Sequence, residues 1–191
     1  MSEFVVSVLA ADRPGIVAAV SGAAAELGGN ITHLSETVLR GYFTIIFIVE
    51  TPDNVTVDQI REAVKDSGGG ESFQVGALPF QEEQAAALPA ESTEQFVLTA
   101  RCKDRKGVIH DISQALAKAG INIADFYAYI VGDELIMVLE LDVNAQTEVA
   151  VVQDRLETLA RDQEIIINFQ HKDIFRATTE LQAVLRLGDK F

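Results

Sequence analysis

Apolar and polar residues alternate along the first third of the chain in a pattern that predicts four elements. Residues 3–10 form an apolar run bounded by charged residues, which is typical of a buried strand. From Pro14 the apolar residues recur with helical spacing until Gly28, a glycine of the kind that ends helices. Residues 30–39 and 42–50 then predict two strands that form a hairpin.

A second helix and a fourth strand complete this unit. Residues 56–67 begin with a threonine or aspartate cap and place their apolar residues on one face. Glycines 68–70 end the helix, and residues 72–80 predict the last strand. The resulting order is β-α-β-β-α-β, the ferredoxin-like arrangement.

The same order returns later in the chain at a fixed offset of 92 residues. Residues 12–17, DRPGIV, correspond to residues 104–109, DRKGVI, and residues 28–31, GGNI, correspond to residues 120–123, GINI. No gap is needed between the two copies, so we interpret the chain as an internal duplication. The predicted fold class is α+β, with two ferredoxin-like βαββαβ domains in tandem and an extra C-terminal helix.

The domain boundaries follow from composition. Residues 81–94 are rich in Glu, Ala, Ser and Pro and lack strand alternation, which is typical of a linker. We therefore expect a first domain over 1–80 and a second over 95–191. After a last strand at 165–169, residues 171–187 carry an apolar stripe with helical spacing, so this helix must dock on a sheet or on another subunit.

Charge and composition exclude several classes of function. The 191 residues include 29 acidic and 15 basic side chains, a net charge of −14 that disfavours direct binding of nucleic acid. No apolar run approaches the roughly 18 residues that span a bilayer, and the N-terminus has no basic region, so no membrane partner and a cytoplasmic location are expected. Residues 40–47 match an RNA-recognition strand only in part, because Phe43 and Thr44 stand where that pattern requires a small residue and an aromatic.

No pattern of catalytic or metal-binding residues is present. Cys102 is the single cysteine, so neither an internal disulfide nor a cysteine-rich zinc site can form, and we expect it to be a buried small residue. The three histidines lie in unrelated contexts, and no nucleophile stands beside a base in a known motif. We therefore predict a protein that is not an enzyme, with no catalytic residue, no metal and no cofactor.

The loop before the first helix carries the candidate chemistry. Gly15 lacks a Cβ and permits close approach, while the helix N-terminus offers unpaired N–H groups that suit a carboxylate. Asp12 could pair with an ammonium group, Arg13 with a carboxylate, and Asn30 offers both a donor and acceptors. The alternative interpretation is structural: Asp12 is then a helix cap, Pro14 a first-turn proline and Asn30 a turn residue.

The strand, the Asp-Arg-Pro-Gly-Ile loop and the Gly-Gly-Asn-Ile segment resemble the ACT domain of amino-acid-sensing regulators. The second copy departs from the motif at Lys106, where the first has Pro14, which favours the first copy as a ligand site. The tandem layout resembles the glycine cleavage system transcriptional repressor family, and residues 170–176 resemble the C-terminus of small single-ACT proteins. The resemblance implies ligand contacts from Asp12, Arg13, Gly15, Ile16, Asn30 and Ile31 in the first copy and from Asp104, Arg105, Gly107, Val108, Asn122 and Ile123 in the second.

The resemblance implies a regulatory protein that senses a small amino acid or a related metabolite. The ligand would lie between the loop of one domain and the second strand of its neighbour, and a protein partner, either an enzyme or a transcription factor, would respond to it. Control of glycine and one-carbon metabolism is the implied process. The alternative is a ligand-free structural or oligomerisation module. In both cases the exposed edge strands predict a homodimer.

Overall fold

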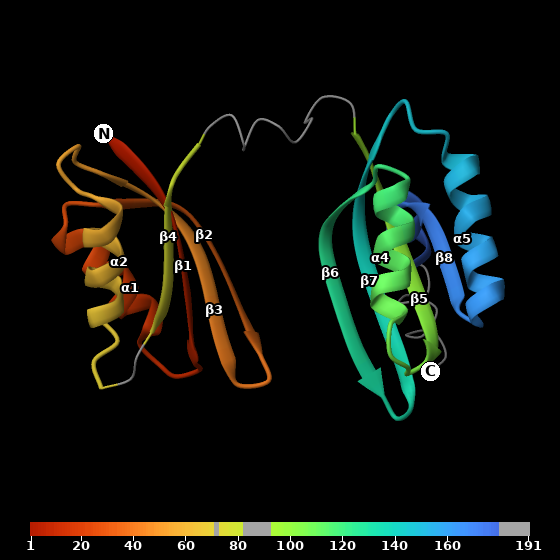
Figure 1. The fold of residues 1–191 in the computed structure, drawn as a ribbon, viewed down its shortest axis with the longest axis horizontal. Coiled ribbons are helices and arrows are strands. Elements are labelled where there is room, and N and C mark those ends of the chain that lie inside the picture. Colours follow the sequence, from red (N-terminus) through yellow and green to blue (C-terminus); the bar gives the residue numbers. More distant parts are fainter. Residues whose placement is uncertain (71–72, 82–92, 180–191) are drawn as a thin grey trace, which may run out of the picture. The chain divides into compact units, whose positions relative to one another are not determined.

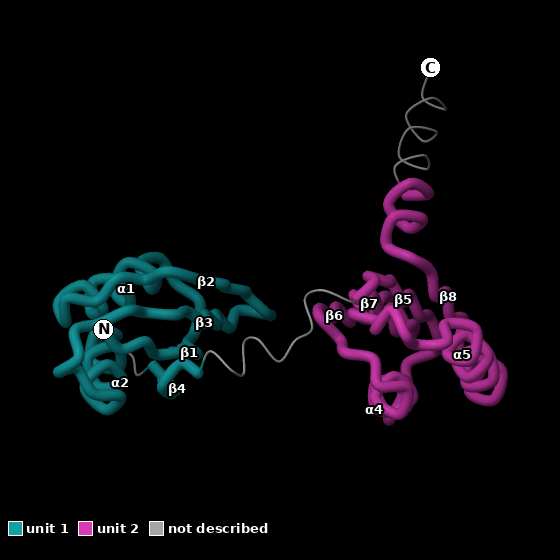
Figure 2. The backbone as a smooth tube through the Cα atoms, turned by 90° about the horizontal axis from the view of Figure 1, so that it is seen from above, with its two compact units in different colours: residues 1–87 teal, residues 88–191 magenta. Residues whose placement is uncertain are grey.

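The computed structural model describes residues 1–70, 73–81 and 93–179 (Figure 1). The chain divides into two compact units, residues 1–87 and residues 88–191 (Figure 2). Most of the linker expected over 81–94 lies outside the described residues. Each unit has its own apolar core, and the two cores share no residue.

Unit 1 is a four-stranded antiparallel sheet with two helices on one face (Figure 1). The strand order is β2-β3-β1-β4, so the two strands that enclose the unit in sequence, β1 and β4, lie side by side. Its elements are β1 (Ser2–Ala11), α1 (Ile16–Glu26), β2 (Asn30–Leu39), β3 (Tyr42–Thr51), α2 (Val57–Asp66) and β4 (Gln74–Pro79).

Unit 2 repeats this fold with the order β6-β7-β5-β8. Its elements are β5 (Thr93–Lys103), α4 (Val108–Lys118), β6 (Asn122–Val131), β7 (Glu134–Asn144), α5 (Val149–Gln163) and β8 (Ile166–His171). Residues 172–179 then form a helix on the opposite side of the sheet from α4 and α5 (Figure 2). The predicted α+β fold with two βαββαβ domains and a C-terminal helix is confirmed, although residues 180–187 of that helix lie outside the described part.

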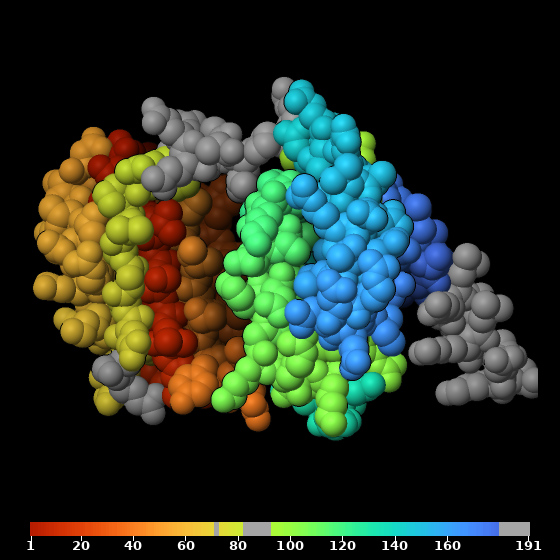
Figure 3. Space-filling model, turned by 45° about the vertical axis from the view of Figure 1, so that its right-hand side comes forward, coloured from red at the N-terminus to blue at the C-terminus, as the bar shows by residue number. Residues whose placement is uncertain are grey.

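The two faces of each sheet differ in burial. In unit 1, Val6 and Phe47 are buried in the same core cluster as Ile60 of α2, while Ile46 on the other face is half exposed. The space-filling view shows β4, β1 and β3 side by side on this uncovered face (Figure 3). The alternation of strand residues therefore directs one side of each strand into the core and the other to an open face.

The strands β2 and β6 are edge strands along their whole length. Most of their residues are exposed, and each carries a register shift near its start, between Ile31 and His33 in unit 1 and between Ile123 and Asp125 in unit 2. The identical position of the bulge in both units agrees with a duplication. The unpaired backbone groups of β2 and β6 leave both strands open to pairing with another chain.

The first helix of each unit begins later than the sequence suggested. We expected a start near Asp12 to Pro14, but α1 begins at Ile16, and its N-cap is Gly15 in the left-handed conformation with φ 91°. Gly107 caps α4 in the same way with φ 93°. The structural interpretation of Asp12 as a helix cap is therefore wrong, because the chain needs a residue with positive φ before it turns into the helix.

Cys102 lies on β5 with its side chain in the core of unit 2, as expected. Burial is the main cause that raises the pKa of the Cys102 thiol above its ordinary value. Because the thiolate is the reactive form, we expect the native protein to react with iodoacetamide at pH 8 at least about tenfold more slowly than the urea-unfolded chain. Mass spectrometry measures the labelling. Equal rates in the native protein and the unfolded chain would contradict the burial of Cys102.

Candidate functional site

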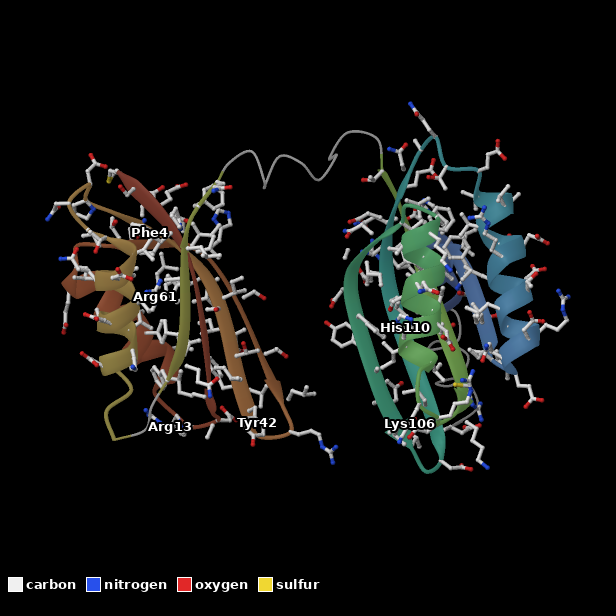
Figure 4. All side chains as sticks on the ribbon, in the orientation of Figure 1. Phe4, Arg13, Tyr42, Arg61, Lys106 and His110 are labelled. Atoms are coloured by element: carbon white, nitrogen blue, oxygen red, sulfur yellow. The ribbon has the colours of Figure 1, made fainter. Side chains whose placement is uncertain are left out.

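The loop between the first strand and the first helix of each unit is fixed to the neighbouring hairpin. The backbone N–H of Asp12 donates to the carbonyl of Gly41 at 2.9 Å, and that of Asp104 donates to the carbonyl of Asp133 at 2.8 Å. The same bond therefore holds the loop in both units. It places the loop, the helix N-terminus and the hairpin tip at one end of the sheet, where Figure 4 shows Arg13 and Tyr42.

The arginine of each loop is bound to the second helix of its own unit. Arg13 donates to the carbonyl of Gly68 at 2.8 Å, and its guanidinium lies 5.7 Å from the centre of the Phe73 ring. Arg105 hydrogen-bonds the backbone carbonyl and the side chain of Gln163, the last residue of α5. A cation at the C-terminal end of a helix satisfies carbonyls that have no partner within the helix. This structural role was not visible in the sequence, because the partners lie 55 and 58 residues away.

The N-termini of α1 and α4 have no side-chain cap. The carbonyls of Gly15 and Gly107 accept the first helical hydrogen bonds, from Ala19 and Asp111. The N–H groups of the first turn precede these bonds and keep their partial positive charge, which favours an anionic group such as a carboxylate.

A hollow of about 570 Å³ adjoins this terminus in unit 2. Four of the residues expected at a ligand site, Asp104, Arg105, Gly107 and Val108, line it. The rest of its wall comes from α4 and from strands β6 and β7, and is mainly apolar: Ile109, His110, Ala128, Tyr129, Ile130 and Leu135. These wall residues were not predicted, because the exposure of the apolar Ile109 and Ile130 is visible only in the fold.

The asparagines expected at the site lie at the other end of each sheet. Asn30 pairs with Glu50 on β3, whereas Ala11, just before the loop, pairs with Tyr42. Tyr42 and Glu50 are eight positions apart on β3, a distance of about 27 Å at the usual rise of a strand. Ile31 and Ile123 follow the asparagines and pack against the two cores. Within one unit, the structure does not bring Asn30 and Ile31, or Asn122 and Ile123, to the loop.

The titratable groups that do not line the hollow form no second candidate site in the part of the chain that the structure describes. A hydrogen bond with the Asp125 carboxylate is the main cause that raises the pKa of Tyr127, on the open face of unit 2. Among the described residues, no group of three or more His, Cys, Asp or Glu side chains could hold a metal ion. In the same ranges, no helix is long and apolar enough to cross a membrane.

Known structures share this tandem arrangement. An unknown protein from Galdieria sulphuraria superposes with a TM-score of 0.72 at 22% identity, over 89% of this chain and 98% of the other. A candidate glycine cleavage system transcriptional repressor superposes with a TM-score of 0.64 at 15% identity, over 90% of this chain and 98% of the other. At these identities the likeness shows the fold alone.

Sequence relatives match a shorter segment. A UPF0237 protein of Methanopyrus kandleri is 42% identical over 69 residues, which is 36% of this chain and 77% of the relative. A UPF0237 protein of Corynebacterium diphtheriae is 43% identical over 63 residues, 32% of this chain and 71% of the relative. The ACT domain model matches residues 4–69 and again residues 96–161. With two domains of this kind in tandem, the chain belongs to the ACT domain family.

Proposed function

We propose that this protein is a regulatory protein that binds a small amino acid or a related metabolite in unit 2. The observation that carries the proposal is the hollow beside Gly107. It joins an uncapped helix N-terminus, a free carboxylate side chain and an apolar wall, which are the three features that an α-amino acid requires.

The proposed pose assigns one role to each part of the hollow. The ligand carboxylate lies at the N–H groups of the first turn of α4, and Asp104 pairs with its ammonium group. The ligand side chain lies against Ile109, Ile130 and Leu135. Because this wall is apolar, aliphatic amino acids should bind more tightly than glycine.

The counterpart of this surface in unit 1 is less suitable. At the offset of 92 residues, Ala128 corresponds to Glu36 and Leu135 to Phe43. A carboxylate near the wall would repel the ligand carboxylate, and the larger ring would occupy part of the volume. The hollow therefore favours a ligand site in unit 2, whereas the intact Asp-Arg-Pro-Gly motif favoured a ligand site in unit 1.

A neighbouring ACT domain would complete the site and relay its occupancy. If the second strand of another domain pairs antiparallel with β6, its asparagine end lies beside the hairpin end of β6, where the loop is. Val17 and Ile109 are exposed apolar residues at equivalent positions beside the two edge strands, and they support a homodimer formed there. Ligand bound between the domains would favour one arrangement over another, and a protein partner, an enzyme or a transcription factor, would respond to it.

The alternative is a ligand-free oligomerisation module, and one observation favours it. Arg13 and Arg105 bind the ends of α2 and α5, and the loops are fixed to the hairpins, so the shared motif has a structural function in both units. In this alternative, the protein would form its oligomer without any small molecule, and no amino acid would change its stability.

Thermal unfolding with each amino acid in turn separates the two proposals. A ligand at 100 times its dissociation constant should stabilise the folded state by about 2.7 kcal/mol, which raises the melting temperature by several degrees. We expect leucine or valine to give a larger shift than glycine, and Asp104→Asn to reduce it. A shift by glycine alone would support a link to glycine metabolism and would contradict the apolar pose. The absence of any shift would favour the module.

A further inference from the structure

Helices α4 and α5 of unit 2 run antiparallel and leave a groove between them. Arg105, just before α4, contacts Gln163 at the end of α5, so the start of one helix lies beside the end of the other. Figure 3 shows the two helices side by side at the surface, α4 in green and α5 in blue. The groove has a volume of about 600 Å³, and Ala115 and Leu159 lie among its lining residues, halfway along it.

The charged residues that line this groove are sorted by sign. Asp111 and Asp162 lie at the end near Arg105, and Lys118 and Arg155 lie at the opposite end. On each helix the acidic and the basic residue are seven positions apart, which is two turns or about 10 Å. The groove therefore has an acidic end and a basic end.

This arrangement pairs Asp111 with Arg105 outside the groove and, among the described residues, forms no ion pair between the two helices. In an antiparallel pair, opposite charges across the groove would form ion pairs between the helices, but here like charges face each other, which is unfavourable within one chain. Asp111 lies 3.9 Å from Arg105, and Lys118 donates to the Gln114 amide. Within the described ranges, the side chains of Arg155 and Asp162 have no hydrogen-bond or ion-pair partner.

Unit 1 does not share this surface. Between Ile16 and Ala25, helix α1 carries no charged residue, and Asp111 corresponds there to Ala19. Arg155 corresponds to Ala63 on α2, a helix of 10 residues that ends before the position equivalent to Asp162, whereas α5 has 15 residues. The sorted charges thus belong to the second copy alone, and the fold itself does not require them.

We propose that this groove is an interface with a second copy of the chain, related by a two-fold axis. A two-fold axis that lies in the interface and runs across the groove places the acidic end of one groove against the basic end of the other, so the surface is complementary to itself. Helix α4 of each copy then packs on α4 of the other and α5 on α5, with Ala115 and Leu159 near the axis. The four charges of the groove sum to zero on a chain with a net charge of −14, so two copies can approach here with little repulsion.

Charge reversal tests this interface. The acidic variant, Lys118→Glu with Arg155→Glu, makes both ends of the groove acidic, so we expect self-association at low salt to weaken at least about tenfold. The control variant, Lys65→Glu with Arg176→Glu, changes the net charge equally at exposed positions outside the groove and should associate like the wild type. Sedimentation equilibrium measures the association constants, and circular dichroism checks that each variant is folded.

Mixing gives the decisive measurement. A basic variant, Asp111→Asn with Asp162→Lys, should also associate weakly by itself, but an equimolar mixture with the acidic variant should associate at least as tightly as the wild type. Because these charges are exposed, about 0.5 M salt should weaken the mixed complex. The proposal is wrong if the acidic variant associates like the wild type, if mixing restores nothing, or if the wild type shows no association that these substitutions alter.

Discussion

Replacing Phe47 with alanine is expected to destabilise unit 1 strongly and to leave the stability of unit 2 unchanged. Phe47 lies at the centre of β3, between Val6 of β1 and Leu34 of β2, and only 1% of its surface is exposed. Removing a buried phenylalanine side chain costs about 3–5 kcal/mol, a large part of the roughly 5–15 kcal/mol by which a domain is stable. Because the two cores share no residue, the loss should stay within unit 1.

Two signals separate the units in this experiment. The first step of urea unfolding, followed by circular dichroism, should move to a much lower concentration in Phe47→Ala, while Cys102 in unit 2 stays protected from iodoacetamide. Ile46→Ala is the matched control, because Ile46 is the next residue of β3 but is 51% exposed on the open face, and it should cost less than about 1 kcal/mol. Simultaneous unfolding of both units, with rapid labelling of Cys102, would show that the units fold as one.

The fold was predictable from the sequence because each element has its own periodic signal and the duplication repeats it. The hairpin turn at Arg40 and Gly41 is where it was expected, and both residues adopt positive φ. The second helix of unit 1 begins with the expected cap: the Thr56 side chain accepts from the N–H of Gln59, and the Gln59 side chain accepts from the N–H of Thr56. These features depend on residues within a few positions of each other.

The start of the first helix could not be placed by the same rules. An aspartate shortly before a proline is typical of a cap and a first helical position, which predicts a start at Pro14, two residues before the observed one at Ile16. The structure instead uses Gly15 in the left-handed region, and the glycine that both copies keep at this position was the available signal.

The candidate site was predictable only in part, because its residues are distant in sequence. The loop motif indicated Asp104, Arg105, Gly107 and Val108, which line the hollow. Its apolar wall requires the pairing of β6 with β7, and the role of Arg105 requires the position of α5. Local sequence patterns predict neither the pairing of β6 with β7 nor the position of α5. They indicate candidate residues for the site, whereas the arrangement of these residues depends on the fold.

Gly107→Val is expected to destabilise unit 2 and to abolish the ligand-induced rise in its melting temperature. Gly107 has φ 93°, and a Cβ added there would meet no atom within 4 Å, so the cost comes from the backbone alone. A β-branched residue disfavours this conformation strongly, by about 1–3 kcal/mol. Relief of the strain would rotate the first turn of α4, whose N–H groups are the proposed carboxylate site.

Gly15→Val is the control that separates the loss of a site from the loss of stability. Gly15 has φ 91° and equally open surroundings, so the same substitution strains unit 1 by a similar amount. If the ligand binds in unit 2, Gly15→Val lowers the melting temperature of unit 1 but keeps the shift caused by an aliphatic amino acid, whereas Gly107→Val loses it. The reverse result would place the ligand in unit 1, beside the intact Asp-Arg-Pro-Gly motif. If the ligand-induced rise in melting temperature is unchanged in both variants, neither helix N-terminus holds the ligand carboxylate. Gly15→Val displaces the N-terminus of α1, and Gly107→Val displaces that of α4.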